Sequence, residues 1–134
     1  WNQLDVAVFG IGASTWSERN LGAGTIRQLE QAQAVGEFLA RPFDVDGRLC
    51  APELGERTIG IEPSALARVP VSIAVAGGES KVVPLLGALR GRFFNVLVTD
   101  RETAERVLEL DATSSKGGVT PPLQPSGEIN VPQR

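Results

Sequence analysis

Short apolar runs alternate with helical patterns along most of this 134-residue chain. The clearest run, Val71 to Ala76, is rich in β-branched residues and stops at Gly77-Gly78, as a buried strand does. A helical pattern follows from Lys81 to Leu89, with Pro84 in or next to its first turn, where a missing N–H costs little. This alternation predicts an α/β domain with a mostly parallel sheet.

The same patterns predict the other elements. We expect a helix that starts at Thr25, with Thr25 and Gln28 as a capping box, and a turn at Asp46-Gly47 that closes a hairpin. Strands are predicted at 4–9, 36–43, 48–50, 57–61 and 94–98, further helices at 63–68 and 102–110, a loop at 13–24, and a flexible tail at 112–134.

Composition limits the class of protein. With 42% hydrophobic and 22% charged residues the chain is typical of one soluble globular domain, and its net charge of -3 argues against binding nucleic acid or an anionic membrane. No apolar run reaches the roughly 18 residues of a membrane span. One cysteine and no histidine exclude a disulfide framework, the usual zinc sites and nucleophile–histidine dyads, and suit a reducing, cytoplasmic compartment. Because the chain starts at Trp1 and contains no methionine, we expect it to be a piece of a longer protein.

The segment Gly77-Gly78-Glu79-Ser80-Lys81 is the first candidate for a binding site. Glycines let the backbone approach a ligand, and the free N–H groups of a helix start attract anions, so a nearby lysine suits a phosphate. A tight turn with a solvated lysine explains the spacing equally well. The segment is not a P-loop, because the G-x-x-x-x-G-K-[ST] spacing is absent.

Two further candidates accompany it. Gly10-Ile11-Gly12 follows the first predicted strand, so it is either a backbone-lined pocket or a plain strand-end turn. Glu37 lies in an apolar segment, where its carboxylate either accepts hydrogen bonds from sugar hydroxyls or faces outward from a strand. Both glycine pairs sit at carboxyl ends of predicted parallel strands, where ligands bind in such sheets.

Other charged residues have simple structural interpretations. Asp44 and Asp46 flank the predicted turn, and Asp100 stands where it would cap the last helix. Arg90 and Arg92 are either basic surface or an interface.

The order of motifs resembles the effector domain of SorC-type sugar-binding transcriptional regulators, which include deoxyribonucleoside regulators. The resemblance runs from about Asp5 to Leu108 through DVAVFGIGA, AVGEFLARPFDVDG, RTIGI and VAGGESKVVPLLGALRGRFFNVLVTDRETA. It implies a Rossmann-like fold related to sugar-phosphate isomerases and deaminases, here incomplete. Residues 1–111 would be the C-terminal part of that effector domain.

The resemblance also implies a function. Such a domain binds a phosphorylated sugar, with no cofactor, and the ligand changes oligomer packing and operator affinity through an N-terminal helix-turn-helix absent from this chain. Lys81 would hold the phosphate, Glu37 a hydroxyl, and Gly10, Ile11, Gly12, Gly77 and Gly78 would line the pocket. The full-length protein would be a homo-oligomer.

The chain departs from the family pattern in several ways. The position of Glu37 is often Asp, and Pro84 stands where a small helix former is usual. The family's effector domain is about twice as long as the matching region, and its Gly-Gly-Thr phosphate loop is not present here.

Two other functional classes remain open at the level of sequence. A sugar-phosphate isomerase or deaminase of the related fold would need a general base, for which only carboxylates such as Glu37 and Asp100 are available. A non-functional remnant would have an unpaired sheet edge and would aggregate.

Overall fold

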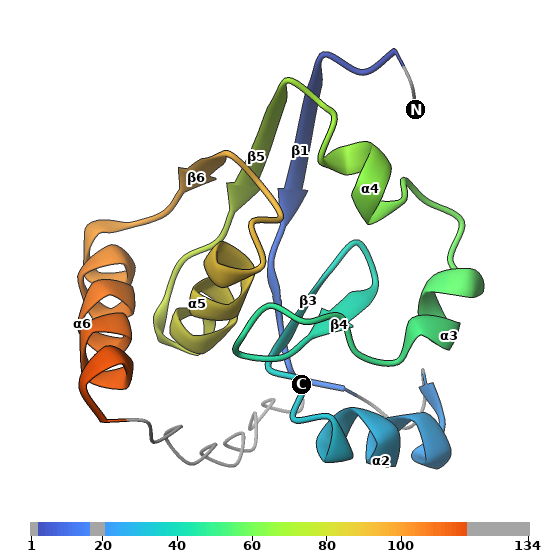
Figure 1. The fold of residues 1–134 in the computed structure, drawn as a ribbon, viewed down its shortest axis with the longest axis horizontal. Coiled ribbons are helices and arrows are strands. Elements are labelled where there is room, and N and C mark those ends of the chain that lie inside the picture. The colour runs from blue at the N-terminus through green and yellow to red at the C-terminus, as the bar shows by residue number, and fades with distance from the viewer. Residues whose placement is uncertain (1–2, 17–20, 118–134) are drawn as a thin grey trace, which may run out of the picture.

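The computed structural model describes residues 3–16 and 21–117, and in this part of the chain a three-stranded parallel sheet forms the centre of the fold (Figure 1). Its strands β1 (Val6–Gly10), β5 (Val71–Val75) and β6 (Val96–Val98) lie in the order β1-β5-β6. Within the described residues β1 and β6 each pair with β5 alone. The predicted parallel α/β architecture is confirmed.

One face of this sheet packs into the core. Phe9 of β1 and Ala74 of β5 are buried in the main apolar cluster, together with Leu85, Leu86 and Ala88 of α5 (Val82–Arg90). Helix α6 (Arg101–Gly117) packs against α5 and contributes Val107 to the same cluster. The predicted strand–helix alternation is therefore correct for this half of the chain.

The opposite face of the sheet carries only apolar side chains and is open. Val6 pairs with Val71, and Val8 pairs with Ile73, which in turn pairs with Val96. Val8 is 66% exposed and Val98 is 51% exposed, although parallel sheets usually have both faces covered.

A second, antiparallel sheet follows β1 directly. It consists of β2 (Gly12–Ala13), β3 (Gly36–Phe38) and β4 (Arg41–Phe43), in that order. Figure 1 shows it on the other side of α5 from α6. The rings of Phe38 and Phe93 stack with centroids 4.3 Å apart, which joins this sheet to the segment after α5.

The prediction of one long strand at 36–43 is wrong, because the chain turns sharply at Leu39 and Ala40. Both residues have positive φ, 49° and 59°, which suits a tight hairpin turn. Side chains hold the turn in place of the usual Asn-Gly: Glu37 Oε2 accepts from the Ala40 N–H at 2.8 Å, and the Arg41 guanidinium donates to the Leu39 carbonyl at 3.1 Å. The predicted turn at Asp46-Gly47 also exists, with Gly47 N–H donating to Asp44 O, but beyond it only an isolated Phe43–Leu49 bridge forms.

Other boundaries differ from the predictions. Residues 57–61 form no strand; a short helix α3 (Pro52–Glu56) precedes them, and the Ile59 side chain is fully exposed. Helix α2 (Ala23–Gln31) begins after Gly22 without a side-chain cap, so the capping box at Thr25 is wrong. The loop predicted at 13–24 contains the end of β2 and the start of α2, and its residues 17–20 lie outside the described ranges.

Two helices lie where they were predicted, and a third is longer than its predicted range. Helix α4 (Pro63–Leu66) and helix α5 lie where the pattern predicts them, and Pro84 is in the first turn of α5. Helix α6 continues to Gly117, so residues 112–117 of the predicted tail are helical, and the rest of that tail lies outside the described residues. In the described part of the chain, none of the helices is both long enough and apolar enough to cross a bilayer.

Candidate functional site

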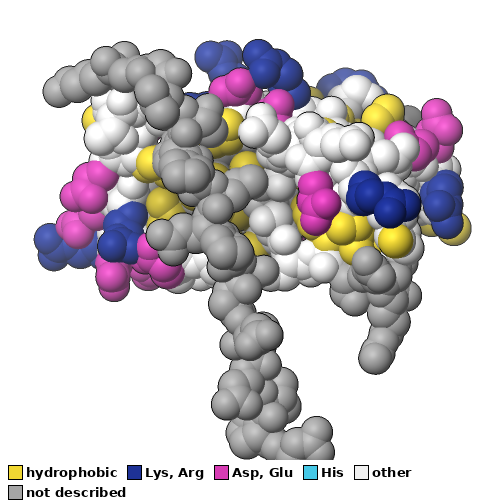
Figure 2. All heavy atoms as spheres, turned by 90° about the horizontal axis from the view of Figure 1, so that it is seen from below, with side chains coloured by type: hydrophobic (Ala, Val, Ile, Leu, Met, Phe, Trp, Pro, Cys, Tyr) yellow, Lys and Arg dark blue, Asp and Glu magenta, His cyan; other side chains and the backbone are white. Residues whose placement is uncertain are grey.

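The carboxyl ends of the three parallel strands form one row. Gly10 pairs with Val75, which pairs with Val98, so the three chain segments that follow leave the sheet at the same edge. Figure 2 views the molecule from this side, with adjoining acidic and basic side chains at the α6 end. The predicted grouping of the two glycine pairs at one edge of the sheet is therefore observed.

The first segment brings Gly12 to Glu37. Gly10 ends β1, the side chain of Ile11 is buried in the core, and Gly12 then pairs with Glu37 across β2 and β3. A Cβ at position 12 would come within 2.9 Å of Glu37 Cγ and Cδ. Gly12 thus leaves room for the Glu37 carboxylate, which is half-buried and folded back along its own hairpin.

The second segment carries the lysine. After Gly77 and Gly78 the chain forms the 3-10 turn η1 (Glu79–Lys81), which continues into α5 and lies against β2. Lys81 is half-buried, and its side chain makes no ion pair or hydrogen bond with any residue in the described ranges. The structure therefore brings the turn that holds Lys81 beside Gly12 and its partner Glu37.

The glycine pair has structural reasons of its own. Gly78 has φ 96°, a conformation that favours glycine. A Cβ at Gly77 would collide with Oδ2 of Asp100. Close approach of a ligand is not needed to explain either glycine.

Asp100 does more than the predicted capping. Its Oδ1 accepts from the Thr103 N–H at 2.8 Å, which confirms the cap on α6. Its Oδ2 accepts from the Gly78 N–H at 3.1 Å and from the Thr103 hydroxyl at 2.7 Å. The Thr103 backbone and hydroxyl, and then the Gly78 N–H, hold the pKa of this carboxyl below its ordinary value despite some desolvation.

Two cavities among the described residues lie near the candidate residues or the second sheet. One, of about 180 Å³, is lined by Gly78, Glu79, Asp100, Thr103 and Arg106 among others, and Glu79 and Arg106 form an ion pair in its wall. The other, of about 350 Å³, lies between β4, α3 and α4 and includes Arg41, Cys50 and Glu62. Lys81 lines neither cavity.

Asp44, Asp46 and Arg90 have structural partners, whereas Arg92 is exposed at the surface. Asp44 Oδ1 accepts from the N–H groups of Asp46 and Arg48, as the turn interpretation predicts. Arg90 bonds Asp111 on α6 at 2.8 Å and lies 3.7 Å from Asp46, so it links α5 to two neighbours. No group of three or more potential metal ligands occurs in the part of the chain that the structure describes.

Sequence reasoning missed the link between Asp100 and Gly78. The two residues are 22 positions apart, and the only sign of it is an aspartate after one strand opposite a glycine pair after its neighbour.

Comparison with known proteins assigns this fold to the sugar-binding domains of transcriptional regulators. Residues 1–109 match the family model "Putative sugar-binding domain", and the chain belongs to this family. Among curated proteins it is 37% identical to the sorbitol operon regulator of Klebsiella pneumoniae over 115 residues, and 36% identical to the deoxyribonucleoside regulator of Bacillus subtilis over 110 residues. These matches cover 81% and 79% of this chain but 36% and 35% of the relatives, so the chain spans about a third of their length.

Solved structures agree with this assignment. A transcriptional regulator from Streptococcus pneumoniae superposes with a TM-score of 0.76 at 38% identity, over 84% of this chain and 45% of the other. The full-length sorbitol operon regulator SorC from Klebsiella pneumoniae superposes with a TM-score of 0.72 at 37% identity, over 81% of this chain and 37% of the other. The resemblance to SorC-type regulators is confirmed.

Proposed function

We propose that this chain is part of the effector-sensing module of a sugar-responsive bacterial transcriptional regulator, and that its ligand is a phosphorylated sugar. The observation that carries the proposal is the position of Lys81: a half-buried cation without an ion pair in the described chain, on a turn that lies against β2. Membership of the sugar-binding family supports a sugar as the ligand. A lysine at the start of a helix suits an anionic group, such as a phosphate, on that sugar.

In this proposal three parts of the protein contact different parts of the ligand. The ammonium group of Lys81 binds the phosphate, together with the N–H groups of Glu79 and Ser80 at the start of η1, which have no partner within that turn. The Glu37 carboxylate accepts a hydrogen bond from a sugar hydroxyl, and the backbone of residues 10–12 and 77–78 borders the ligand. The Gly78 N–H is already donated to Asp100 and Thr103, so it is not among the phosphate donors.

The proposed role is a signal and not a reaction. The relatives named above are regulators, which supports sensing over the isomerase or deaminase alternative. Ligand binding would alter the packing of a homo-oligomer and the operator affinity of a DNA-binding domain elsewhere in the full-length protein.

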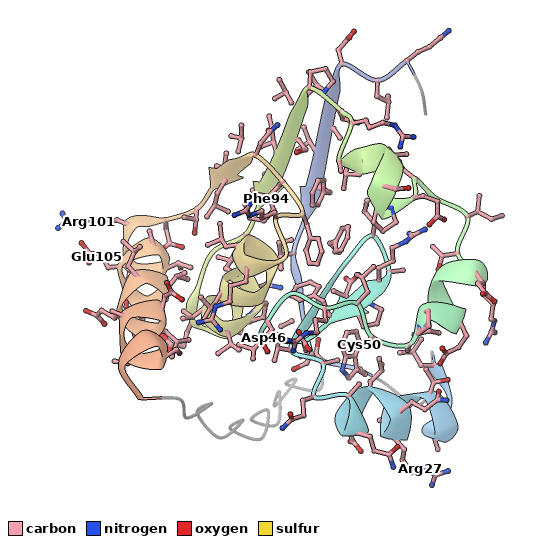
Figure 3. All side chains as sticks on the ribbon, in the orientation of Figure 1. Arg27, Asp46, Cys50, Phe94, Arg101 and Glu105 are labelled. Carbon is pink, nitrogen blue, oxygen red and sulfur yellow. The ribbon has the colours of Figure 1, made fainter. Side chains whose placement is uncertain are left out.

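Thermal unfolding with a panel of pentose and hexose monophosphates tests the proposal. A ligand at a hundred times its Kd should stabilise the protein by about 2.7 kcal/mol. Lys81→Ala should abolish the shift, whereas Arg101→Gln, which removes one positive charge from an exposed i,i+4 pair with Glu105, should retain it. Figure 3 shows Arg101 and Glu105 on the outer side of α6, away from the sheet.

Two results would count against the proposal. One is the absence of a shift with any sugar phosphate in the wild type, and the other is an undiminished shift in Lys81→Ala. Conversion of the sugar phosphate, followed by NMR over hours, would favour the enzyme alternative.

A further inference from the structure

Asp100 ties together two segments that leave neighbouring strands. The carboxylate stands between β6 and α6, yet it also bonds the turn that follows β5. We propose that Asp100 is a positioning residue of the effector site: it holds the Gly77–Gly78 turn against the first turn of α6 and thereby fixes the direction in which η1 presents Lys81. The inference rests on the proposed function, since it concerns the same site.

The contacts form a closed set around one carboxylate oxygen. Oδ2 accepts from the Gly78 N–H at 3.1 Å and from the Thr103 hydroxyl at 2.7 Å, and that hydroxyl oxygen itself accepts from the Gly78 N–H at 2.8 Å. Thr103 is 2% exposed, so its side chain has little freedom to leave this arrangement. Three groups from two chain segments therefore lock one another.

A single hydrogen bond connects this arrangement to the backbone of Lys81, the residue proposed to bind the phosphate. The carbonyl of Gly78, whose N–H Asp100 holds, accepts from the Lys81 N–H at 2.9 Å. Gly78 is in a conformation that glycine adopts with unusual freedom, and a Cβ there would meet nothing within 4 Å. Besides Asp100, the turn is tied to α6 by the Thr103 hydroxyl, which itself bonds Asp100, and by the ion pair of Glu79 with Arg106.

The effect of neutralising Asp100 on phosphate affinity distinguishes a positioning role from charge repulsion. A carboxylate near a bound phosphate repels it, so neutralising the carboxylate would, by charge alone, tighten binding. A positioning role predicts the opposite sign, because the turn loses its anchor. Glu79, Glu102 and Arg106 line the same cavity, and Glu102 makes no hydrogen bond or ion pair there.

Asp100→Asn separates the helix cap from the anchor. Asparagine caps helices as well as aspartate does, so it can still accept from the Thr103 N–H. With that oxygen in place, the other end of its amide is an NH₂ group, which cannot accept from the Gly78 N–H. We expect an unfolding temperature close to that of the wild type but sugar-phosphate affinity about tenfold lower, as for the loss of one hydrogen bond to a charged group.

Matched variants make the comparison specific. Glu102→Gln removes an equal charge beside the same cavity and should leave the affinity unchanged or slightly higher. Thr103→Val should weaken binding, and Thr103→Ser, which keeps the hydroxyl, should restore it. Inorganic phosphate and the unphosphorylated sugar serve as probes, and the loss in Asp100→Asn should appear with phosphate and not with the sugar alone.

Amide hydrogen exchange in the ligand-free protein gives a readout independent of sugar binding. In Asp100→Asn the Gly78 amide should exchange faster while the amides of α6 keep their rates. Unchanged exchange at Gly78, or tighter phosphate binding in Asp100→Asn, would overturn the positioning role. If the wild type binds none of the probes, the proposed function fails and the positioning role fails with it, whereas binding that depends on Lys81 but not on Asp100 overturns this inference alone.

Discussion

Gly12 and Glu37 face each other across the β2–β3 pair, and the Glu37 side chain fills the space that a side chain at position 12 would need. Gly12→Ala should therefore push the carboxylate away from the Ala40 N–H and destabilise the hairpin by about 1 to 3 kcal/mol, as overpacking does. Urea unfolding measures the change.

A second glycine provides the control for this prediction. Gly24 lies in α2 with no atom near a would-be Cβ, so Gly24→Ala should stabilise the chain by about 0.5 to 1 kcal/mol. In a Glu37→Ala background the cost of Gly12→Ala should shrink, because the colliding side chain is gone. An equal cost in both backgrounds would contradict the steric explanation.

The lowered pKa of Asp100 predicts a pH dependence of stability. Its folded-state pKa lies below the ordinary value of 3.8, so its hydrogen bonds contribute fully above that pH and are lost as the pH falls through the folded-state pKa. The stability difference between wild type and Asp100→Ala, which removes both carboxylate oxygens, should thus be constant near neutral pH and shrink in acid. Urea unfolding from pH 7 downward measures this difference, with Glu102→Gln as control. A stability difference that grows in acid would contradict the prediction.

Removal of Glu62, the exposed partner of the buried Arg41, should lower stability more than its exposure suggests. The Arg41 side chain is 5% exposed and that of Glu62 is 65% exposed, with 2.7 Å between Nη2 and Oε1. Glu62→Ala leaves a buried guanidinium without its carboxylate partner, with the Leu39 carbonyl as its remaining acceptor, and should cost about 2 to 3 kcal/mol. Glu62→Gln keeps an acceptor and should cost about 1 kcal/mol. Glu30→Ala, on the exposed surface of α2, should change stability by less than about 0.5 kcal/mol, and equal effects of the two Glu62 variants would refute the argument.

Cys50 should be a slow thiol. Burial, and secondarily the charge of Asp44, raise the pKa of its thiol, and the residue is 8% exposed. Alkylation by iodoacetamide near pH 8 should be much slower in the folded chain than in urea, because little thiolate is present or accessible. A native rate equal to the denatured rate would show that the site opens freely.

The sequence predicts those features of the structure that are determined by residues close together along the chain. The parallel strands and α5 follow from apolar runs and glycine stops, and the Asp100 cap follows from an aspartate before a helix. The turn at Leu39 and Ala40 has no such signal, since its left-handed residues are stabilised by the Glu37 and Arg41 side chains rather than by glycine or asparagine. Residues 57–61 have β-prone composition but no neighbouring strand to pair with in the described chain.

The candidate site divides in the same way. The sequence indicated that both glycine turns would share one edge of the sheet, because strand ends in a parallel sheet meet there. It did not indicate that Gly77 accommodates Asp100, or that Gly12 accommodates Glu37, since both are contacts between residues far apart along the chain. The roles of Lys81 and Glu37 as ligands stay predictions, as does the division at residue 111.

Helix α6 is held by Asp100 at its start and along its length by packing on α5 and by the Arg90–Asp111 ion pair. Its 17 residues, at about 1.5 Å each, give a length of about 25 Å from the Asp100 joint to Gly117. Because Arg90 links the two helices as far along as Asp111, a tilt of α6 about its start would move α5, the helix that Lys81 precedes, together with the distant end of α6.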